Sequence, residues 1–194
     1  MHITDDVRLD ANFDQLRQRL LDPDSLSPLR GAPVFYFVYE PRQILAVRRL
    51  LPSWVARLRN EQNLDVQVIS MAEVLWQLID DSGRWEAWLE AEKDFDQHEI
   101  NQSIASVLQD ENVLVNHVAG LITSSKPDTV MFITDIELLH PFARSRPVES
   151  ILQNPYQNNP TVFFYPGRRA GQYGLKFLGF YPEDTGYRST LIGE

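Results

Sequence analysis

A chain of 194 residues with 43% hydrophobic and 11% aromatic residues is long and apolar enough for a packed core, which excludes a disordered segment. The net charge of −9 disfavours general binding to nucleic acid, because that affinity comes largely from neutralised phosphates. The absence of cysteine excludes disulfides, thiolate nucleophiles and cysteine zinc sites, and it fits a reducing cytoplasm.

The sequence also shows no sign of membrane insertion or secretion. No apolar run approaches the roughly 20 residues that are needed to span a bilayer. The first ten residues, MHITDDVRLD, lack the basic and apolar regions of a secretory signal. We therefore expect a cytoplasmic protein with one domain over residues 1–194, in which residues 1–32 form an N-terminal helix and loop and residues 33–194 form the core.

The first predicted elements are a short helix at Asn12–Leu21 and a strand at Val34–Tyr39, which is apolar throughout, as is typical of a central strand. Arg42–Asn60 follows as an amphipathic helix. Pro52 predicts that this helix is kinked or split, because an interior proline removes a hydrogen bond. Its polar side carries five arginines: Arg42, Arg48, Arg49, Arg57 and Arg59. This arginine face is either an ordinary solvated surface or a docking site for an acidic partner or a nucleic-acid backbone.

The middle of the chain is predicted to be mainly helical. Asp65–Ile69 alternates between apolar and polar residues and predicts a strand. Ser70 and Glu73 have the spacing of a capping box for a helix that runs to Asp81. Arg84–Phe95 and Glu99–Ser124 are helical by pattern, and the second is expected to break near residues 110–112. Trp85 and Trp88 fit either an interface anchor or the core, and the core is the commoner place for tryptophan.

The last third of the chain is predicted to form the rest of the sheet. Val130–Ile133 and Thr161–Tyr165 are short apolar runs, typical of buried strands. Pro166–Gly174 is expected to be a turn that carries Arg168 and Arg169. Leu175–Phe180 and Tyr187–Ile192 are expected to be antiparallel strands at the edge of the sheet. Strands separated by helices predict an α/β fold, with a mostly parallel sheet between flanking helices in three layers.

Two carboxylates at the end of one predicted strand are the best candidates for chemistry. Asp135 and Glu137 follow Val130–Ile133, and ligands bind at the carboxyl ends of strands in open α/β sheets. Asp135 either helps to hold a magnesium ion with Glu137 or caps the helix that follows. No lysine follows a glycine, so the standard phosphate-binding loop is absent. We expect a scaffold resembling a P-loop domain without that loop.

Other common catalytic motifs are missing. The chain contains no dinucleotide-binding glycine fingerprint and no nucleophile elbow. The four histidines, His2, His98, His117 and His140, lack the spacing of metal ligands. His117 lies among apolar helix positions and is expected to be a hydrogen-bonded core residue.

Three stretches of the chain together resemble a known family. TVFFYPG at residues 161–167, followed by LKFLGF and GYRSTLI, is similar to the C-terminal signature of the BrxB family of BREX bacteriophage-exclusion systems. VFYFVYEPRQILAVRRLLPSW resembles the N-terminal part of that family. Pro141 and Arg144 match its Pro-x-x-Arg stretch. The resemblance runs from about Pro33 to the end of the chain.

The resemblance implies a cytoplasmic role in phage defence beside other BREX proteins, which include a DNA methyltransferase, a large ATPase and the alkaline-phosphatase-like protein PglZ. It implies no catalytic residue, cofactor or metal. The expected function is that of a non-enzymatic assembly factor, with PglZ as the expected direct partner. The arginine face, or the turn with Arg168 and Arg169, would supply the contact surface.

Two other functions compete with this expectation. The first is a magnesium-dependent nucleotide-binding switch or hydrolase that uses Asp135 and Glu137. The second is a DNA-binding accessory protein that uses the arginine face, although the acidic composition means that direct binding to nucleic acid is not expected.

Overall fold

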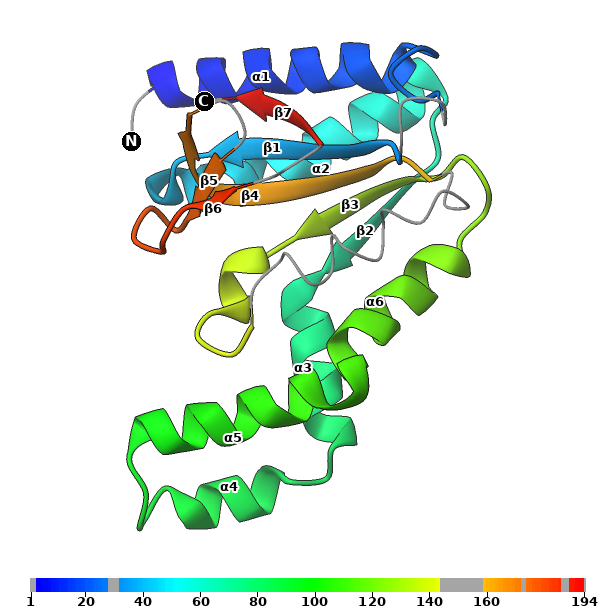
Figure 1. The fold of residues 1–194 in the computed structure, drawn as a ribbon. Coiled ribbons are helices and arrows are strands. Elements are labelled where there is room, and N and C mark those ends of the chain that lie inside the picture. The colour runs from blue at the N-terminus through cyan, green and yellow to red at the C-terminus, as the bar shows by residue number, and fades with distance from the viewer. Residues whose placement is uncertain (1–2, 28–31, 144–158, 172–173, 186–188, 194) are drawn as a thin grey trace.

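A computed structural model describes residues 3–27, 32–143, 159–171, 174–185 and 189–193 of the chain. It shows a mostly parallel sheet with helices on both faces, which is the predicted α/β arrangement (Figure 1). The α-helices are α1 (Ile3–Leu21), α2 (Ile44–Gln62), α3 (Met71–Asp81), α4 (Trp85–Ala91), α5 (Gln97–Gln109) and α6 (Val113–Thr123). Short 3₁₀ helices are η2 (Pro41–Gln43), η3 (Asp110–Asn112) and η4 (Ile136–Leu139). None of the helices described is both long and apolar enough to cross a membrane.

The described residues form a seven-stranded sheet. Its strands are β1 (Val34–Tyr39), β2 (Val66–Ser70), β3 (Val130–Thr134), β4 (Thr161–Ala170), β5 (Gly174–Phe177), β6 (Asp184–Thr185) and β7 (Thr190–Gly193). Five strands follow the order β2-β3-β4-β1-β7 and are parallel, while β5 is antiparallel to β4 and to β6. The carboxyl ends of β1, β2 and β3 therefore lie along one edge of the sheet.

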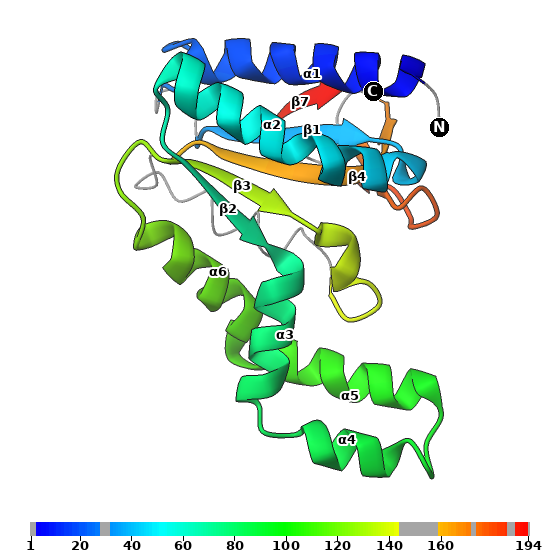
Figure 2. The same cartoon turned by 180° about the vertical axis from the view of Figure 1, so that it is seen from behind.

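The order of the strands explains which helices cover which face. From β1 the chain passes through α2 to the far edge at β2, and then steps back through β3 and β4 toward β1. Crossovers between parallel strands are almost always right-handed, so the two directions place their helices on opposite faces. Accordingly α1 and α2 lie on one face and α3 and α6 on the other (Figures 1 and 2). α4 and α5 lie farthest from the sheet, where α5 packs against α3 and α6.

Side chains of the strands alternate between two hydrophobic clusters, as the pleat of a strand requires. On the α1–α2 face, Trp54 packs among Phe37 and Phe164 and stacks on Phe13, with 4.8 Å between ring centroids. On the other face a cluster built around Tyr36 packs against α3 and α6. β1 is buried at every position, as predicted for a central strand.

Several predicted boundaries differ from the structure. α1 begins at Ile3, nine residues before the predicted start at Asn12. α2 continues through Pro52 without being split, since the packing of its apolar face outweighs the one hydrogen bond that the proline removes. The predicted break near residues 110–112 is confirmed by η3. Ser70 caps α3 by accepting a hydrogen bond from the Glu73 backbone, so its half of the predicted capping box is present.

The C-terminal strands also differ from prediction. β4 continues to Ala170, so Arg168 and Arg169 lie on a strand that pairs with β5, and the turn is shorter than the predicted Pro166–Gly174. β7 is parallel to β1, which contradicts the expected antiparallel pairing, while β5 is antiparallel as expected. Arg144 and Tyr187, which entered the sequence predictions, lie outside the described residues. The resemblance to a P-loop scaffold is not confirmed.

Candidate functional site

The carboxyl edge of the sheet gathers polar groups from three strands. β1 ends at Tyr39, β2 at Ser70 and β3 at Thr134, and Ser70 lies opposite Thr134 in the parallel register. Asp135 follows directly with a left-handed backbone, at φ 56°. This conformation is uncommon for residues other than glycine, and it turns the chain sharply from β3 into η4. Asp135 is thereby held at the edge where α/β sheets bind ligands.

The Asp135 side chain does not cap η4, so the simpler of the two predictions for this residue is wrong. Its Oδ2 accepts a hydrogen bond from the Ser70 hydroxyl at 2.7 Å and one from the Thr134 hydroxyl at 3.2 Å. Its Oδ1 lies 2.9 Å from Nε of Arg48. A carboxylate with these three partners is held in place by β2, β3 and α2 together.

Arg48 links the predicted arginine face to the two candidate carboxylates, which the sequence analysis considered separately. Besides Asp135, it binds Glu137, with 2.9 Å between its NH2 nitrogen and Oε1. A guanidinium has a planar fork of donors, which suits it to bridge two carboxylates. One residue of the predicted arginine face thus binds both candidate metal ligands, and it lies 89 positions from Glu137 in the sequence.

The environment of Glu137 is apolar enough to change its chemistry. Its side chain is only 9% exposed, and Oε2 is buried with no hydrogen-bond partner among the described residues. Burial raises the pKa of this carboxyl, and the nearby Asp135 raises it further, against the lowering effects of its own backbone and of Arg48. Burial also raises the pKa of the neighbouring Tyr39 hydroxyl well above its ordinary value, and both carboxylates add to that effect.

A hollow of about 460 Å³ opens beside these groups, lined by Tyr39, Arg48, Ser70, Asp135 and Glu137 among others. The two carboxylates could supply oxygen ligands to a magnesium ion. However, each already binds the Arg48 guanidinium, and that positive charge competes with a cation. Among the described residues, no group of three or more histidine, aspartate or glutamate side chains could hold a metal ion. Metal binding by Asp135 and Glu137 stays a prediction.

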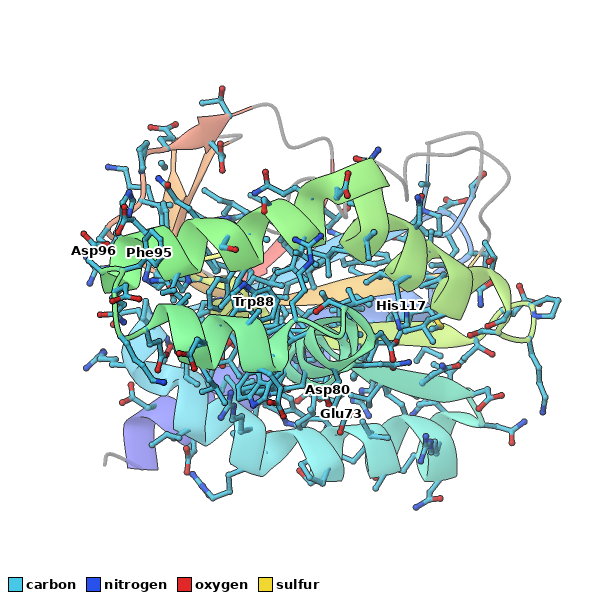
Figure 3. All side chains as sticks on the ribbon, turned by 90° about the horizontal axis from the view of Figure 1, so that it is seen from below. Glu73, Asp80, Trp88, Phe95, Asp96 and His117 are labelled. Carbon is cyan, nitrogen blue, oxygen red and sulfur yellow. The ribbon has the colours of Figure 1, made fainter. Side chains whose placement is uncertain are left out.

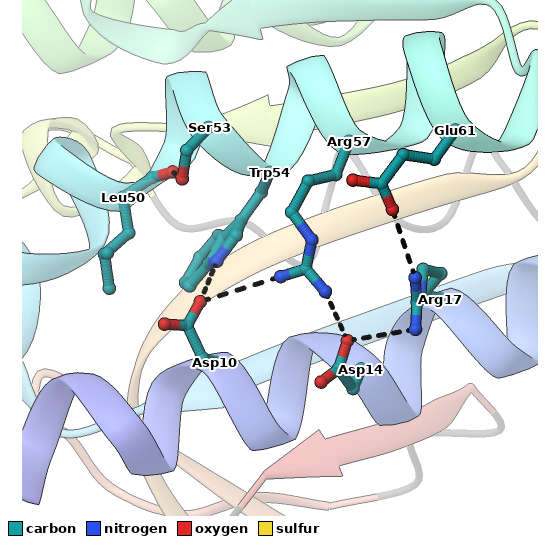
Figure 4. Close-up of polar contacts among 8 residues, drawn as sticks. All are labelled: Asp10, Asp14, Arg17, Leu50, Ser53, Trp54, Arg57 and Glu61. Carbon is teal, nitrogen blue, oxygen red and sulfur yellow. Dashed lines mark hydrogen bonds and ion pairs between the residues drawn. The ribbon is translucent and has the colours of Figure 1, made fainter.

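Most of the other predicted arginines are engaged by this chain's own acidic residues. Arg57 lies between Asp10 and Asp14 of α1, with 2.6 Å to Asp14 (Figure 4). Arg49 binds Asp6 at 2.7 Å, and Arg42 lies near Glu40 and Asp5. The Arg59 guanidinium donates to the carbonyl of Val66. The five arginines thus point to α1, to the sheet edge and to β2, and they do not form the single face that was predicted.

Arg168 and Arg169 are exposed near the end of β4. The Arg169 guanidinium donates to the carbonyl of Leu191 at 3.1 Å. This bond joins β4 to the C-terminal strand. A partner-binding role for these two arginines, or for the arginines of α2, stays a prediction.

A second hollow lies in the helical part of the molecule, and sequence analysis did not find it. It is a groove of about 320 Å³ between α3, α4 and α5, with residues of η4 and the segment after it at one end. Its lining is mostly apolar and includes Leu75, Trp76, Ile79, Trp85, Trp88 and Leu89. In Figure 3, Trp88 lies between the ribbons of α4 and α5, and Phe95 and Asp96 lie at the turn that joins these helices.

The tryptophans of this groove are not all core residues. Trp88 is buried, as expected, and its ring nitrogen donates to the Ser103 hydroxyl at 3.0 Å. Trp85 is 44% exposed and Trp76 is 54% exposed, and their rings meet edge to face with 5.9 Å between centroids. The signal in the sequence was Trp76 itself, a large apolar residue outside the apolar stripe of α3. We refer to the hollow lined by Trp76, Trp85, Trp88 and Leu89 as the α3–α5 groove.

His117 also differs from its prediction. It is half-buried on α6, and its Nε2 is buried with no hydrogen-bond partner among the described residues. The prediction that His117 is a hydrogen-bonded core residue is therefore wrong for its Nε2 atom. Leu114 and Val118, which lie near His117 in the sequence of α6, belong to the buried cluster, as the sequence pattern indicated.

Comparison with known proteins adds the family. No solved structure gives a significant match to the chain. A protein of Bacillus cereus (strain H3081.97), described as BREX protein BrxB, is 22% identical over 188 residues, which cover 94% of this chain and 96% of that protein. The model of the family described as BREX protein BrxB matches residues 67–192, more than half of the chain and including most of the groove and the sheet edge. The chain therefore belongs to the BrxB family of BREX proteins.

Proposed function

We propose that this chain is a non-enzymatic assembly factor of a cytoplasmic BREX phage-defence complex, and that it binds another BREX protein directly. Membership of the BrxB family supports a role in phage defence among other BREX proteins. PglZ is the partner that we expect, and the BREX ATPase and methyltransferase are the alternatives. The partner-binding surface in this proposal is the α3–α5 groove.

The observation that carries the proposal is the exposure of large apolar side chains around one groove. Trp76, Trp85 and Leu89 leave about half of their surface open to water, although each belongs to a residue type that favours burial. Scattered apolar residues are ordinary on a protein surface, but a contiguous group marks an interaction site. Tryptophan in particular is enriched among the residues that dominate binding at interfaces.

The test is co-expression with the PglZ of the same BREX system, followed by affinity capture and size-exclusion chromatography. We expect the two proteins to elute together as a defined complex. The double variant Trp76→Ser/Trp85→Ser should lose the complex while it stays folded. Leu45→Ser is the matched control, because Leu45 is 70% exposed on α2, away from the groove. Separate elution of folded wild-type proteins, with PglZ and with the other BREX proteins in turn, would refute the assembly role.

A second candidate function rests on Glu137. Its buried Oε2 lacks a hydrogen-bond partner among the described residues, and Glu137 lines the hollow at the sheet edge, which is a position for a ligand. This favours the magnesium-dependent nucleotide switch over the DNA-binding alternative, because Arg49 and Arg57 of the latter are engaged by acidic residues of α1. Titration calorimetry with magnesium and nucleotide tests it, and Asp135→Asn should abolish any binding. No heat at millimolar nucleotide would remove this candidate.

A further inference from the structure

We propose that the α3–α5 groove takes a basic amphipathic helix presented by a partner protein. This inference rests on the assembly role proposed above and names the chemistry of the partner at the same site. It follows from three properties of the described residues: the apolar floor of the groove, the acidic charge around it, and the helical elements that line it.

The floor of the groove needs an apolar occupant. Trp88 and Ile79 are buried at its base, while Trp76, Trp85 and Leu89 rise along its sides and are about half exposed. Covering these three side chains would remove their apolar surface from water, which is the main driving force for association. The T-shaped contact between Trp76 and Trp85 holds both rings in place before a partner arrives, so little side-chain freedom is lost on binding.

The helices that line the groove are strongly acidic, and Glu92 is among the lining residues. Residues 71–109, which form α3, α4 and α5, contain nine acidic and two basic residues, a net charge of −7 in a chain of net charge −9. All nine carboxylates are exposed: Glu73, Asp80, Asp81, Glu86, Glu90, Glu92, Asp94, Asp96 and Glu99. Lys93 binds Glu90 at 2.8 Å, and this is the ion pair that the described residues show within the segment. A partner with lysine and arginine beside its apolar residues would complement this charge.

The shape of the lining favours a helix over a strand. The walls of the groove are helices whose apolar residues recur every three or four positions, such as Ala72, Leu75 and Ile79 on α3. A partner helix can lay its own apolar ridge between such rows. A partner strand would need an open sheet edge with which to exchange backbone hydrogen bonds, and the residues that line the groove belong to helices, to η4 and to the segment after it.

The same charge disfavours the other occupants of an apolar groove. A second copy of this chain would bring two acidic segments together. An anionic membrane or a nucleic acid would be repelled by the carboxylates around the tryptophans. A basic protein helix gains from both the apolar floor and the acidic rim.

The probe for this inference is a designed helical peptide of about five turns, with leucines along one face and lysines beside them. Two control peptides have the same leucines with glutamate for every lysine, or the same composition with the leucines scattered around the helix. Binding to the full chain is measured by titration calorimetry and by tryptophan fluorescence. We expect saturable binding of the lysine peptide alone, weakened when NaCl rises from about 50 mM to about 500 mM.

Variants of the chain locate the binding. Leu89→Glu should weaken binding of the lysine peptide about tenfold or more, because it places a charge on an apolar side of the groove. Leu45→Glu on α2 introduces the same charge at another exposed leucine and should leave binding unchanged. The pair Asp80→Lys/Glu92→Lys should weaken it roughly threefold at low salt. Asp24→Lys/Glu183→Lys, an equal change of net charge at exposed positions elsewhere, should have less effect.

Equal binding of the lysine and glutamate peptides, or absence of binding by the lysine peptide, would overturn the inference. So would a concentration-dependent dimer that Leu89→Glu abolishes, because the occupant would then be a second copy of the chain. A BREX complex that forms in co-expression and is unaffected by Leu89→Glu leaves the assembly role standing and refutes this site. Peptide binding without any BREX complex supports the groove chemistry and refutes the assembly role.

Discussion

The two helical layers of this protein differ in whether their charged and aromatic side chains are buried and paired or exposed to solvent. In the layer of α1 and α2, Trp54 is fully buried and its ring nitrogen donates to Asp10 at 2.6 Å, while Arg49 and Arg57 of α2 bind aspartates of α1. In the segment of α3, α4 and α5, Trp76 and Trp85 are about half exposed, and most of the carboxylates form no ion pair with any described residue. The first layer satisfies its own groups, and the second presents groups that a partner can satisfy.

The difference bears on which surface could bind a partner. An arginine-rich helix in an acidic chain suggested a docking surface, and two of its arginines, Arg49 and Arg57, are paired with aspartates of α1. Exposed ion pairs of this kind contribute little to stability individually. The groups that stand ready for a partner are the apolar and acidic side chains of α3 to α5.

The largest expected effect separates the tryptophans of the two regions. Trp54→Ala should lower the free energy of unfolding by about 3 to 5 kcal/mol, because it opens a cavity among Phe13, Phe37 and Phe164. Trp76→Ala, at a side chain that is 54% exposed, should lower it by less than about 1 kcal/mol. Urea denaturation followed by circular dichroism measures both. Equal losses would mean that Trp76 is a core residue and that the comparison fails.

A smaller effect tests whether the arginines of α2 serve the contact with α1. Arg57 is partly buried, binds Asp14 at 2.6 Å and lies over the ring of Phe13, with 5.3 Å to its centroid. Arg57→Ala should therefore lower the free energy of unfolding by about 1 kcal/mol. A double-mutant cycle with Asp14→Ala separates the ion pair from the contact with Phe13. If Arg57→Ala left stability unchanged and weakened binding of the BREX partner, the docking surface would lie on α2 instead.

At the sheet edge between the two regions, Glu137 should make stability depend on pH. Its pKa is raised above 4.5 in the folded protein, so the folded state holds the proton more tightly than the unfolded state. Relative to Glu137→Gln, the wild type should be most stable below pH 4.5 and lose stability as pH rises through the raised pKa. Urea titrations across this range measure the difference. Glu73→Gln, at an exposed carboxylate, is the control, and a difference that grows with pH would be the wrong sign.

The smallest effect is expected within the acidic segment itself. Lys93 and Glu90 form an ion pair on α4 and the turn after it, with both side chains at least 66% exposed. Solvent screens such a pair, so Lys93→Ala should change the free energy of unfolding by less than about 0.5 kcal/mol. The same variant adds to the acidity of the groove and should slightly strengthen binding of the lysine peptide. Clear destabilisation would show that this pair is structural.

Much of the fold could be predicted because its strands are short apolar runs with a clear length and clear boundaries. Val34–Tyr39 and Val130–Ile133 are buried strands, and the helices between them fall where the apolar period places them. Other features depend on partners that are remote in sequence. The parallel direction of β7 follows from its place beside β1, and the extension of β4 to Ala170 follows from its pairing with β5. Neither partner can be read from local periodicity.

The sequence predicted Asp135, Glu137 and Arg48 as candidate site residues, but it did not predict that they contact one another. Asp135 and Glu137 were found because they follow a buried strand, and Arg48 because it lies on the polar side of a helix. The contacts of Arg48 with the two carboxylates depend on how α2 crosses the sheet, and local sequence does not contain that information. The α3–α5 groove was missed because tryptophan is usually buried, and only the packing of three helices decides that Trp76 and Trp85 stay open.

The most direct test of the contrast between the two layers is hydrogen–deuterium exchange of the chain, alone and in complex with the BREX protein that co-elutes with it. We predict that amides of residues 71–109 gain protection in the complex, most of all in α4, while those of α1 and α2 exchange at unchanged rates. Protection confined to α1 and α2, with no change across residues 71–109, would contradict the assignment of the groove as the partner-binding surface.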